Sequence, residues 1–465
     1  MSTFKFTKKQ QEAYDLVMQG KNVFLTGEGG TGKSEVIKRV KQNCTKKVVI
    51  TSTTGTSALL LGGTTLHSFL GIGLGDGCVD WILEHKILTK KYITKRWRTR
   101  GLLLVIDEVS MLSPELFDKL SEIAKRVRKC QKPWGGIQLL LSGDFLQLPV
   151  VNSDLFTFQA QRWNESIHKT VCLDENVRQS KDVLYGGILS RIRMGEHTQE
   201  DIDELNKRYN VKLTNSGLSF TKLYTTNWKV DQENSRNLDR LNNEADDLMF
   251  MQYDMKVTTD PLDNVPEWVI DKARKDCVAP EEVLLCPGAQ VMLLVNIFEG
   301  EGENKTLVLS NGSIGKVVSF RQADDVPIVS FPDDVVQERA IGDNLWEIRR
   351  PEKSKQKHPD FVITQIPLRL AYAITIHKSQ GSTMTCAEID IQNCFCPGQG
   401  YVALSRVKSL NGLSLKTKVR MEDIKADPTC VKFYKAHEKG VSLSSDAQEA
   451  KHNELKLSFF KLIIK

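Results

Sequence analysis

One glycine-rich segment near the start of this 465-residue chain restricts its fold more than any other feature: Gly27–Ser34, with the sequence GEGGTGKS. It follows an apolar run of strand length, Asn22–Thr26, and precedes a helical repeat in which Val36, Ile37 and Val40 share one side. The glycines let backbone N–H groups approach phosphates closely, and the following helix contributes the positive end of its dipole. The segment therefore predicts a phosphate-binding loop between a strand and a helix.

The rest of the first half repeats the order of strand, loop and helix. Apolar runs at Lys47–Thr51, Leu102–Ile106 and Ile137–Leu141 have strand length, and Pro114 opens a helical repeat that extends to about Arg128. Alternating helices and strands, the strands rich in leucine and β-branched residues, are typical of a parallel sheet covered by helices. We therefore expect an α/β domain around the glycine-rich loop.

The second half repeats the alternation of strands and helices, but a segment with a different sequence pattern interrupts it. We expect strands at Leu218–Thr225 and Ala387–Ile391, and helices at Asn227–Asn242 and Leu370–Ile376. Between them lie short strand candidates separated by Gly, Asn, Asp and Pro, which suggest a small antiparallel barrel inserted into a second α/β domain. These candidates are Gln290–Asn296, Gly315–Phe320, Pro327–Phe331 and Phe361–Gln365.

Residues around the glycine-rich loop have the types that phosphoryl transfer needs. Lys33 is expected to reach the β- and γ-phosphates of a nucleotide, and Ser34 to ligate magnesium. Asp107 ends a predicted strand and can hold the same metal, and Glu108 beside it can act as base on the attacking water. Gln147, after the fourth predicted strand, is placed to contact the γ-phosphate. An Asp-Glu pair alone is more often a helix cap, so this interpretation depends on its position behind an apolar strand.

Composition excludes several classes of protein. Hydrophobic residues make up 40% and charged residues 26%, which is typical of a globular chain. No apolar run approaches the ~20 residues that span a bilayer, and the polar N-terminus lacks the apolar core of a secretory signal. Ten cysteines form no framework, so we expect reduced thiols inside a cell, in nucleus or cytoplasm, with a viral source left open. A net charge of +6 permits a polyanionic partner.

Further segments make the chain recognisable. From Phe6 to Leu413 it resembles the PIF family of 5′→3′ DNA helicases, the branch of superfamily one that is related to RecD. The segments that carry the resemblance are Phe6–Gln10 (FTKKQ), Gly62–Phe69 (GGTTLHSF), Asp118–Leu120 through Trp134–Gln138, Ile376–Gly381 (IHKSQG) and Tyr401–Arg406 (YVALSR).

The resemblance implies an α/β fold with two RecA-like P-loop domains in tandem, a small inserted β-barrel and a short wedge insertion. The expected boundaries are 1–170 for the first RecA-like domain with the wedge region at 71–100, 171–282 and 366–435 for the second RecA-like domain, 283–365 for the barrel, and 436–465 for a tail.

The resemblance also implies a site for ATP and Mg²⁺ between the two RecA-like domains. Gln10 would read adenine, and Arg178 and Arg406 would reach the γ-phosphate from the second domain, where an arginine stabilises transition-state charge. The expected catalytic residues are Lys33, Asp107, Glu108, Gln147, Arg178 and Arg406. The expected nucleotide-binding residues are Gln10, Gly27, Gly29, Gly30, Thr31, Gly32, Lys33, Ser34 and Gly381, and the metal ligands are Ser34 and Asp107.

The expected partners are single-stranded DNA and duplex or forked DNA, bound by a monomer that does not associate with membranes. Aromatic rings and hydroxyl or basic groups suit base stacking and phosphate contacts. A buried histidine and a core phenylalanine remain the alternative for His67 and Phe69. The expected nucleic-acid contacts are Thr53, Gly55, Thr65, His67, Phe69, Trp97, His377, Lys378 and Ser379.

One basic segment, Lys90–Arg100, holds six positive charges and no acid, interleaved with Tyr92 and Trp97. It lies where the family inserts its strand-separating wedge. We therefore expect Trp97 to present a flat apolar face to the terminal base pair of a fork, with neighbouring cations on the phosphates. A solvated basic face or a localisation signal is the alternative.

Three other functions share some of these features. A GTPase or kinase would use the same phosphate-binding loop, but the chain lacks an N-K-x-D guanine-reading element. A clamp or loading subunit would hydrolyse ATP on DNA without separating strands. An RNA helicase would use the same ATP-hydrolysing domains but move along RNA instead of DNA. The resemblance to the PIF family implies an ATP-dependent 5′→3′ DNA helicase that serves replication, repair, recombination or telomere maintenance.

Overall fold

The computed structural model describes residues 6–438 with the exception of 55–56, 59–60, 74, 76, 151–152, 213–219, 245–248, 260–264, 266, 296, 300–305, 310–311, 333, 335, 349–360 and 393. The predicted nucleic-acid contact Gly55 and nearly all of the predicted tail, 436–465, lie outside the described residues.

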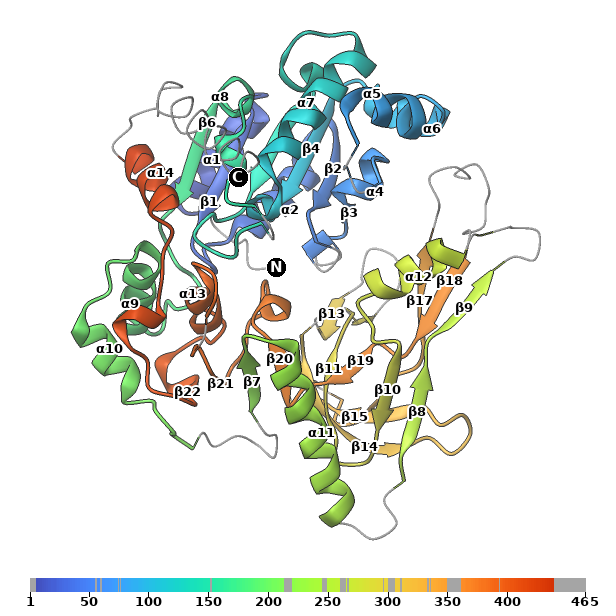
Figure 1. The fold of residues 1–465 in the computed structure, drawn as a ribbon, viewed down its shortest axis with the longest axis vertical. Coiled ribbons are helices and arrows are strands. Elements are labelled where there is room, and N and C mark those ends of the chain that lie inside the picture. Colours follow the sequence, from blue (N-terminus) through green and yellow to red (C-terminus); the bar gives the residue numbers. More distant parts are fainter. Residues whose placement is uncertain are drawn as a thin grey trace, which may run out of the picture.

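The first unit is built on a six-stranded parallel sheet in the order β3-β2-β4-β5-β1-β6, flanked by helices (Figure 1). Every residue of the central strands β1, β4 and β5 is buried, as expected where helices cover both faces. The strands are β1 (Val23–Gly27), β2 (Lys47–Ser52), β3 (Thr64–Thr65), β4 (Leu102–Asp107), β5 (Gln138–Ser142) and β6 (Lys169–Leu173). The helices are α1 (Lys8–Met18), α2 (Lys33–Asn43), α4 (Leu66–Leu70), α5 (Val79–Ile82), the π-helix η1 (Leu83–Ile87), α6 (Lys91–Trp97), η2 (Val109–Met111), α7 (Pro114–Arg128), η3 (Pro133–Gly136), η4 (Thr157–Gln159) and α8 (Trp163–Ser166).

The sequence explains why α7 forms where it does. The Ser113 side chain caps its N-terminus by accepting from the Leu116 N–H at 3.2 Å, and Pro114 occupies the first turn. The helix ends at Lys129, which has a left-handed backbone with φ of 50°. Phe117 and Leu120 lie on its buried face against the sheet. This packing holds β4 and β5 with their carboxyl ends at one edge, where ligands bind in parallel sheets.

The second unit has a four-stranded parallel sheet in the order β20-β7-β21-β22. The following helix, α14, returns to the first unit, where Cys430, Phe433 and Tyr434 join the core that packs on the first sheet (Figure 1). The strands are β7 (Thr221–Tyr224), β20 (Ala373–Thr375), β21 (Ala387–Ile389) and β22 (Leu413–Leu415). The helices are α9 (Val183–Met194), α10 (Gln199–Asn206), α11 (Asn227–Glu244), η7 (His377–Ser379), α13 (Gln399–Leu404), η8 (Leu410–Gly412), η9 (Met421–Asp423) and α14 (Pro428–Glu438).

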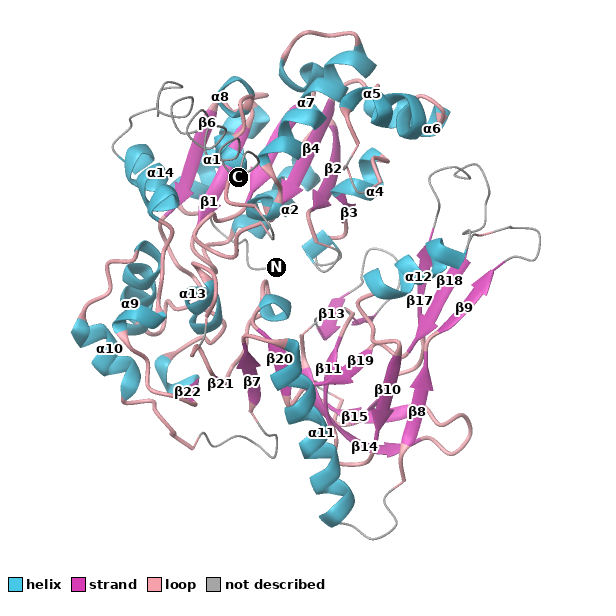
Figure 2. Cartoon of the chain, in the orientation of Figure 1, coloured by secondary structure: helices cyan, strands magenta, loops and turns pink. Residues whose placement is uncertain are grey.

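The inserted region is antiparallel, as predicted, and lies beside α11 (Figure 2). Its largest sheet has the order β16-β15-β14-β11-β19, and a smaller one has the order β17-β18-β9. Among the described residues the five-stranded sheet is open, so no described pairing closes it into a barrel. The elements are β8 (Met251–Asp254), β9 (Lys256–Thr259), α12 (Glu267–Asp276), β10 (Glu282–Leu285), β11 (Gln290–Leu293), β12 (Ile297–Glu299), β13 (Thr306–Leu309), β14 (Ile314–Phe320), β15 (Pro327–Ser330), β16 (Arg339–Ala340), β17 (Asn344–Ile348), β18 (Phe361–Gln365) and β19 (Leu368–Leu370).

The strand pairing places the boundaries of the first unit and of the inserted region differently from the expected positions. β6 pairs with β1 as far as Leu173, so the first unit extends past residue 170. β8 pairs with β10, β9 with β18 and β19 with β11, so the insertion covers 251–370 rather than 283–365. The helix predicted at Leu370–Ile376 is wrong, because β19 and β20 occupy this stretch. A short apolar run suits a strand or a buried helix equally, and here the sheet supplies its partners.

Candidate active site and nucleic-acid surface

The glycine-rich loop joins β1 to α2 at the carboxyl edge of the first sheet. Gly32 caps α2 with a left-handed φ of 86°, and a Cβ there would lie 2.5 Å from the Gln10 Nε2. Gly30 also has a left-handed φ, and its Cβ would lie 2.4 Å from the Arg178 Cβ. Glycine is therefore required at both positions, by backbone conformation and by close neighbours. The loop is held between α1 and the segment after β6.

Lys33, the first residue of α2, folds over this loop. Its Nζ donates to the carbonyl oxygens of Gly27 at 2.7 Å and Glu28 at 2.9 Å. Burial lowers its pKa, while the carboxylates of Asp144, Glu108 and Asp107 act in the opposite direction. The ammonium group thus lies over the loop and close to three acids, where a nucleotide would place its phosphates.

Gln10 supports the loop from α1. The Thr7 side chain and Gln10 form a capping box, in which the Gln10 Oε1 accepts from the Thr7 N–H at 3.0 Å. The Gln10 Nε2 donates to the Thr31 carbonyl at 2.9 Å, and the residue is fully buried. Both ends of this amide already bond to backbone, so its contact with adenine stays a prediction.

The predicted acid pair lies at the end of β4. The Asp107 Oδ2 accepts from the Ser57 Oγ at 2.7 Å. Glu108 has a left-handed backbone with φ of 52°, which is uncommon outside glycine and often marks functional sites. Its Oε2 accepts from the Gln380 Nε2 of the second unit at 3.1 Å. Burial and the neighbouring Asp107 raise the Glu108 pKa to about 7, although the charge of Lys33 acts to lower it. A carboxyl that titrates near neutral pH suits a general base.

Two arginines of the predicted site converge on the loop. A Cβ on Gly29 would lie 3.5 Å from both the Arg178 Nη1 and the Arg406 Nη2. Arg406 is 1% exposed and donates to the carbonyls of Val402 and Ser382 and to the Ser405 Oγ. Burial and the charge of Arg178 lower the Arg406 pKa to about 9.

Neither arginine has a carboxylate partner among the residues that the structure describes; Arg178 donates to the Ser405 carbonyl at 3.0 Å. Buried charges are normally paired. Two guanidinium groups beside a phosphate-binding loop therefore fit the phosphates of a bound nucleotide.

Other residues of the second unit already touch the loop. The Asn176 Nδ2 donates to the Glu28 Oε2 and the Gly29 carbonyl, both at 3.3 Å. The Gly29 N–H donates to the Tyr401 hydroxyl at 3.2 Å. The cleft is thus closed around its glycine-rich edge by contacts from both units.

A buried network that sequence reasoning missed lies behind Gln147. Asp144 forms a two-point ion pair with Arg193 of α9, with both N–O distances at 2.9 Å. The Tyr434 hydroxyl of α14 donates to the Asp144 Oδ1 at 3.2 Å and also contacts the Thr26 Oγ1 at 2.7 Å. Burial raises the Asp144 pKa, but Arg193 outweighs it, so the pKa lies below its usual value.

The Gln147 Nε2 bonds to Asp144 at 3.4 Å, so this network positions the predicted phosphate sensor. Asp144 stands three residues before Gln147 in the same motif, which was the available signal.

Residues predicted to contact nucleic acid in the first unit lie near the ends of β2 and β3. The Thr53 Oγ1 donates to the Glu108 carbonyl at 2.8 Å, which ties this segment to the acid pair. Thr65 caps α4 by accepting from the Ser68 N–H. His67 and Phe69 are half-buried in α4, and Phe69 lies 5.7 Å beneath the Arg96 guanidinium.

Two side chains that were predicted to contact nucleic acid are buried in this structure. Trp97 is fully buried in the core of the first unit, and its Nε1 donates to the Leu70 carbonyl at 2.9 Å. It has no free face for a base pair. Ser379 is also fully buried, with its Oγ donating to the Ile376 carbonyl at 2.7 Å. Both side chains stabilise local structure instead.

The second unit contributes His377 and Lys378 from the turn after β20. The His377 ring stacks on Phe395, with centroids 5.8 Å apart and planes 14° apart. Phe395 is 67% exposed, and both rings line a cavity of ≈ 560 Å³ that also contains Gln147. Sequence reasoning missed Phe395. Gly381 has a left-handed φ of 82° in the same turn, next to Ser382, whose carbonyl accepts from Arg406.

The donor set near the loop fits the predicted magnesium. Ser34 is exposed at the start of α2, and the Asp107 carboxylate ends β4, which together offer the oxygen ligands that Mg²⁺ prefers. Within the described ranges, no group of three or more His, Cys, Asp and Glu side chains is arranged to hold a metal ion. Of the helices that the structure describes, none is both long and apolar enough to cross a bilayer.

Comparisons with known proteins agree with this geometry. The family profile described as PIF1-like helicase matches residues 5–193. An uncharacterized protein (030L) of Invertebrate iridescent virus 6 is 33% identical, over 93% of this chain and 94% of its own. The ATP-dependent DNA helicase PIF1 of Xenopus laevis is 34% identical over 92% of this chain, which spans 64% of that relative's length.

Solved structures extend the likeness to the whole fold. The Pif1 helicase of Candida albicans matches with a TM-score of 0.78 and 32% identity, covering 93% of this chain and 99% of its own. Bacteroides Pif1 bound to single-stranded DNA matches with a TM-score of 0.67 and 28% identity, covering 94% and 98%. The chain belongs to the PIF1-like helicase family.

Proposed function

We infer that this protein is an ATP-dependent DNA helicase with 5′→3′ polarity. The observation that carries the inference is the pair Arg178 and Arg406, which approach the glycine-rich loop from the second unit without a carboxylate partner among the described residues. A nucleotide in the cleft would supply the missing anion and hold the two units together. A cleft whose closure depends on the nucleotide can convert hydrolysis into movement.

Each residue of the cleft has a separate part in hydrolysis. Lys33 binds the β- and γ-phosphates of ATP, and Glu108 accepts a proton from the attacking water. Arg406 and Arg178 stabilise the charge that spreads over the transferred phosphoryl group. Ser34 and Asp107 would hold Mg²⁺, which neutralises phosphate charge when bound. Gln147, positioned by Asp144, senses the γ-phosphate.

A short path connects the cleft to the predicted track. Gln380, which donates to Glu108, lies in the same turn as His377 and Lys378. The Arg406 Nη1 donates to the Ser382 carbonyl of that turn at 3.2 Å. Loss of the γ-phosphate would change the contacts of Glu108 and Arg406 and would therefore move this turn.

We propose single-stranded DNA as the track, with fork DNA as the unwound substrate. Bacteroides Pif1 has been seen bound to single-stranded DNA, and its fold matches this chain. His67, Phe69, His377 and Lys378 would contact the strand, and a base would stack on Phe395. With Trp97 buried, we propose that other residues of 71–100 form the strand-separating element. Replication, repair and recombination remain the processes that this activity would serve.

Nucleic-acid dependence of ATP turnover tests this function. Single-stranded DNA should raise the turnover strongly above its basal rate, and RNA of the same length should raise it less. Equal or better stimulation by RNA would favour an RNA helicase. Turnover that no nucleic acid changes would favour a different P-loop enzyme.

A further inference from the structure

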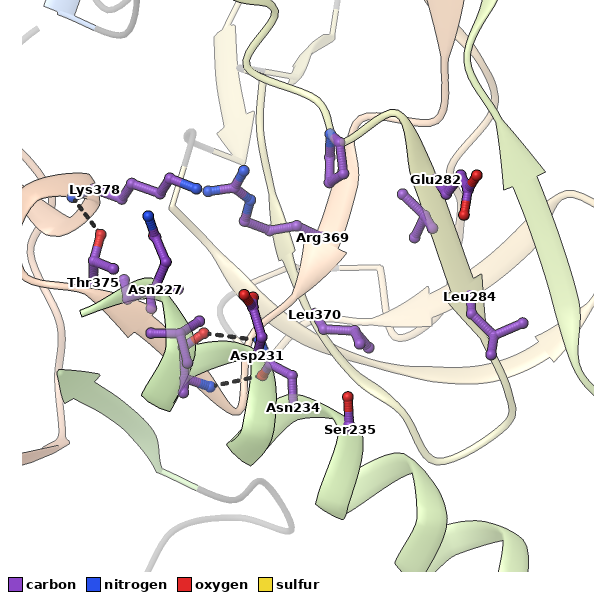
Figure 3. Close-up of a pocket in the computed structure, with 15 residues that line it drawn as sticks. Asn227, Asp231, Asn234, Ser235, Glu282, Leu284, Arg369, Leu370, Thr375 and Lys378 are labelled. Atoms are coloured by element: carbon purple, nitrogen blue, oxygen red, sulfur yellow. Dashed lines mark hydrogen bonds between the residues drawn. The ribbon is translucent and has the colours of Figure 1, made fainter. Parts of the chain in front are cut away.

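A cavity of ≈ 290 Å³ lies where the second parallel sheet meets the inserted region (Figure 3). It is bounded by α11, β10, β19, β20 and η7. Arg369 of β19 and Lys378 of η7 point toward one another across it, and the Asn227 amide of α11 lies beside them (Figure 3). The insertion and the second unit thus each contribute a cation to one cavity.

Neither of these two cations forms an ion pair with a residue that the structure describes. Arg369 donates to the Val278 carbonyl at 3.3 Å, and the Lys378 Nζ has no hydrogen-bond or ion-pair partner among the described residues. Burial lowers the pKa of both groups, and the charge of Arg369 lowers that of Lys378 further. Asp231 of α11 faces Lys378 and offsets part of this repulsion, but it forms no ion pair with either cation.

Two like charges that point toward one another repel unless an anion lies between them. The cavity also offers the Asn227 side chain as a neutral hydrogen-bond donor, and its two carboxylates are Asp231 and Glu282, of which Glu282 lies away from the two cations (Figure 3). A guanidinium, an ammonium and an amide around one space suit a tetrahedral oxyanion, because the guanidinium can donate two parallel hydrogen bonds. The chemistry therefore indicates a phosphate group.

We propose that Arg369 and Lys378 together bind one backbone phosphate of the translocated single strand. The proposal rests on the proposed function, which places the strand beside His377, the residue before Lys378. It assigns Arg369 a role that the sequence motifs do not include. It also gives the inserted region a direct hold on the strand, so that the turn linked to Glu108 through Gln380 and the insertion would grip the same phosphate.

The salt dependence of DNA binding tests this site. The affinity for a fluorescent oligothymidylate is measured by anisotropy across a fourfold rise in salt, without nucleotide. Each phosphate neutralised on a single strand contributes about 0.7 to the slope of log affinity against log salt. The double variant R369Q/K378Q should therefore lose about 0.7 from the slope, so that the wild type loses about 2.6-fold more affinity than the variant over this range. Each single variant should lose no more than the double variant.

The control is R240Q, which removes the same charge from α11. Arg240 is exposed and ion-paired with Glu244, so its slope should equal that of the wild type. R369K keeps the charge and should keep most of the slope. Thermal melting establishes that each variant is folded. K378Q, which alters an exposed side chain, provides a folded variant should R369Q melt early.

Three results would overturn the proposal. The first is an unchanged slope in folded R369Q/K378Q, and the second is a loss of about 1.4, which would mean two separate phosphates. The third is stabilisation of the DNA-free protein by inorganic phosphate, lost in the double variant while the slope stays constant, which would assign the cavity to a free anion. A wild-type ATPase that ignores single-stranded DNA would instead overturn the proposed function and this site with it.

Discussion

The nucleotide cleft and helix α6 both place arginines beside aromatic rings, but they use them differently. In the cleft, Arg193 lies 4.6 Å from the Tyr434 ring, while the nearby Arg406 has no carboxylate partner among the described residues. In α6, Arg96 lies over Tyr92 and Phe69 at 5.5 and 5.7 Å, and its Nη1 bonds to the Ser68 carbonyl.

The two arginines differ in the partners of their guanidinium groups. Arg96 of α6 bonds to carbonyl oxygens of the first unit, whereas Arg406 in the cleft is buried and forms no ion pair with a described residue. A basic and aromatic composition therefore does not identify a binding surface. An unpaired buried cation does, because its cost must be offset by a ligand.

Removing Lys33 from the nucleotide cleft should give the largest loss of ATP turnover. Lys33→Ala should reduce ATP turnover to background, because no other described cation contacts the loop carbonyls of Gly27 and Glu28. Binding of single-stranded DNA should survive, since Lys33 lies in the nucleotide cleft. Turnover is measured with saturating DNA, and binding by anisotropy. A variant that hydrolyses ATP normally would remove the loop from the mechanism.

Arg406→Ala should lower turnover by ~10³-fold or more, the typical cost of losing a transition-state arginine. ATP binding should stay within a few-fold of the wild type. Arg406 also bonds to Val402 and Ser382, so Arg406→Lys and a thermal melt control for local unfolding. Normal DNA-stimulated turnover in folded Arg406→Ala would show that the arginine does not act on the nucleotide.

On the α6 side, Trp97→Ala should destabilise the protein by about 3–5 kcal/mol, the usual cost of deleting a buried large aromatic side chain. Unwinding and ATP turnover should fall together, in proportion to the folded fraction. Trp81, 44% exposed in the same region, provides the matched control, and Trp81→Ala should change stability by less than about 0.5 kcal/mol. Denaturant unfolding measures both. Loss of unwinding alone in Trp97→Ala would restore the wedge role.

The smallest expected effect concerns pH. The Glu108 pKa of about 7 means that its base form dominates at pH 8 and its protonated form at pH 6. Since kcat/KM for ATP reports groups of the free enzyme, it should rise about tenfold between these values. ATP affinity, measured in parallel, should change less. A flat kcat/KM profile across this range would mean that Glu108 is not the base.

Local motifs explain how much of this site could be predicted. Gly27–Ser34 and the Asp107-Glu108 pair depend on a strand end and its next residues, so sequence spacing was sufficient for them. Arg193 and Tyr434 meet Asp144 only through tertiary packing between distant segments, and no spacing rule reports such a contact. The same holds for Phe395 and Arg369.

In the fold, too, features with a local sequence signal were predicted and features that depend on tertiary packing were not. The parallel strands around the loop were predicted because alternating strands and helices repeat there. Leu370–Ile376 was misassigned, since an apolar run of this length lacks a distinguishing period. The ring of Trp97 was expected to be exposed and is buried for a related reason: the charges around it do not show which face of α6 packs inward.

Strand displacement separates an ATP-driven helicase from a DNA-dependent clamp. Duplexes with a 5′ or a 3′ single-stranded tail are mixed with protein, ATP and Mg²⁺, and the released strand is measured. We expect release from the 5′-tailed duplex, little from the 3′-tailed one, and none with Lys33→Ala. DNA-stimulated ATP turnover without release from either duplex would contradict this expectation.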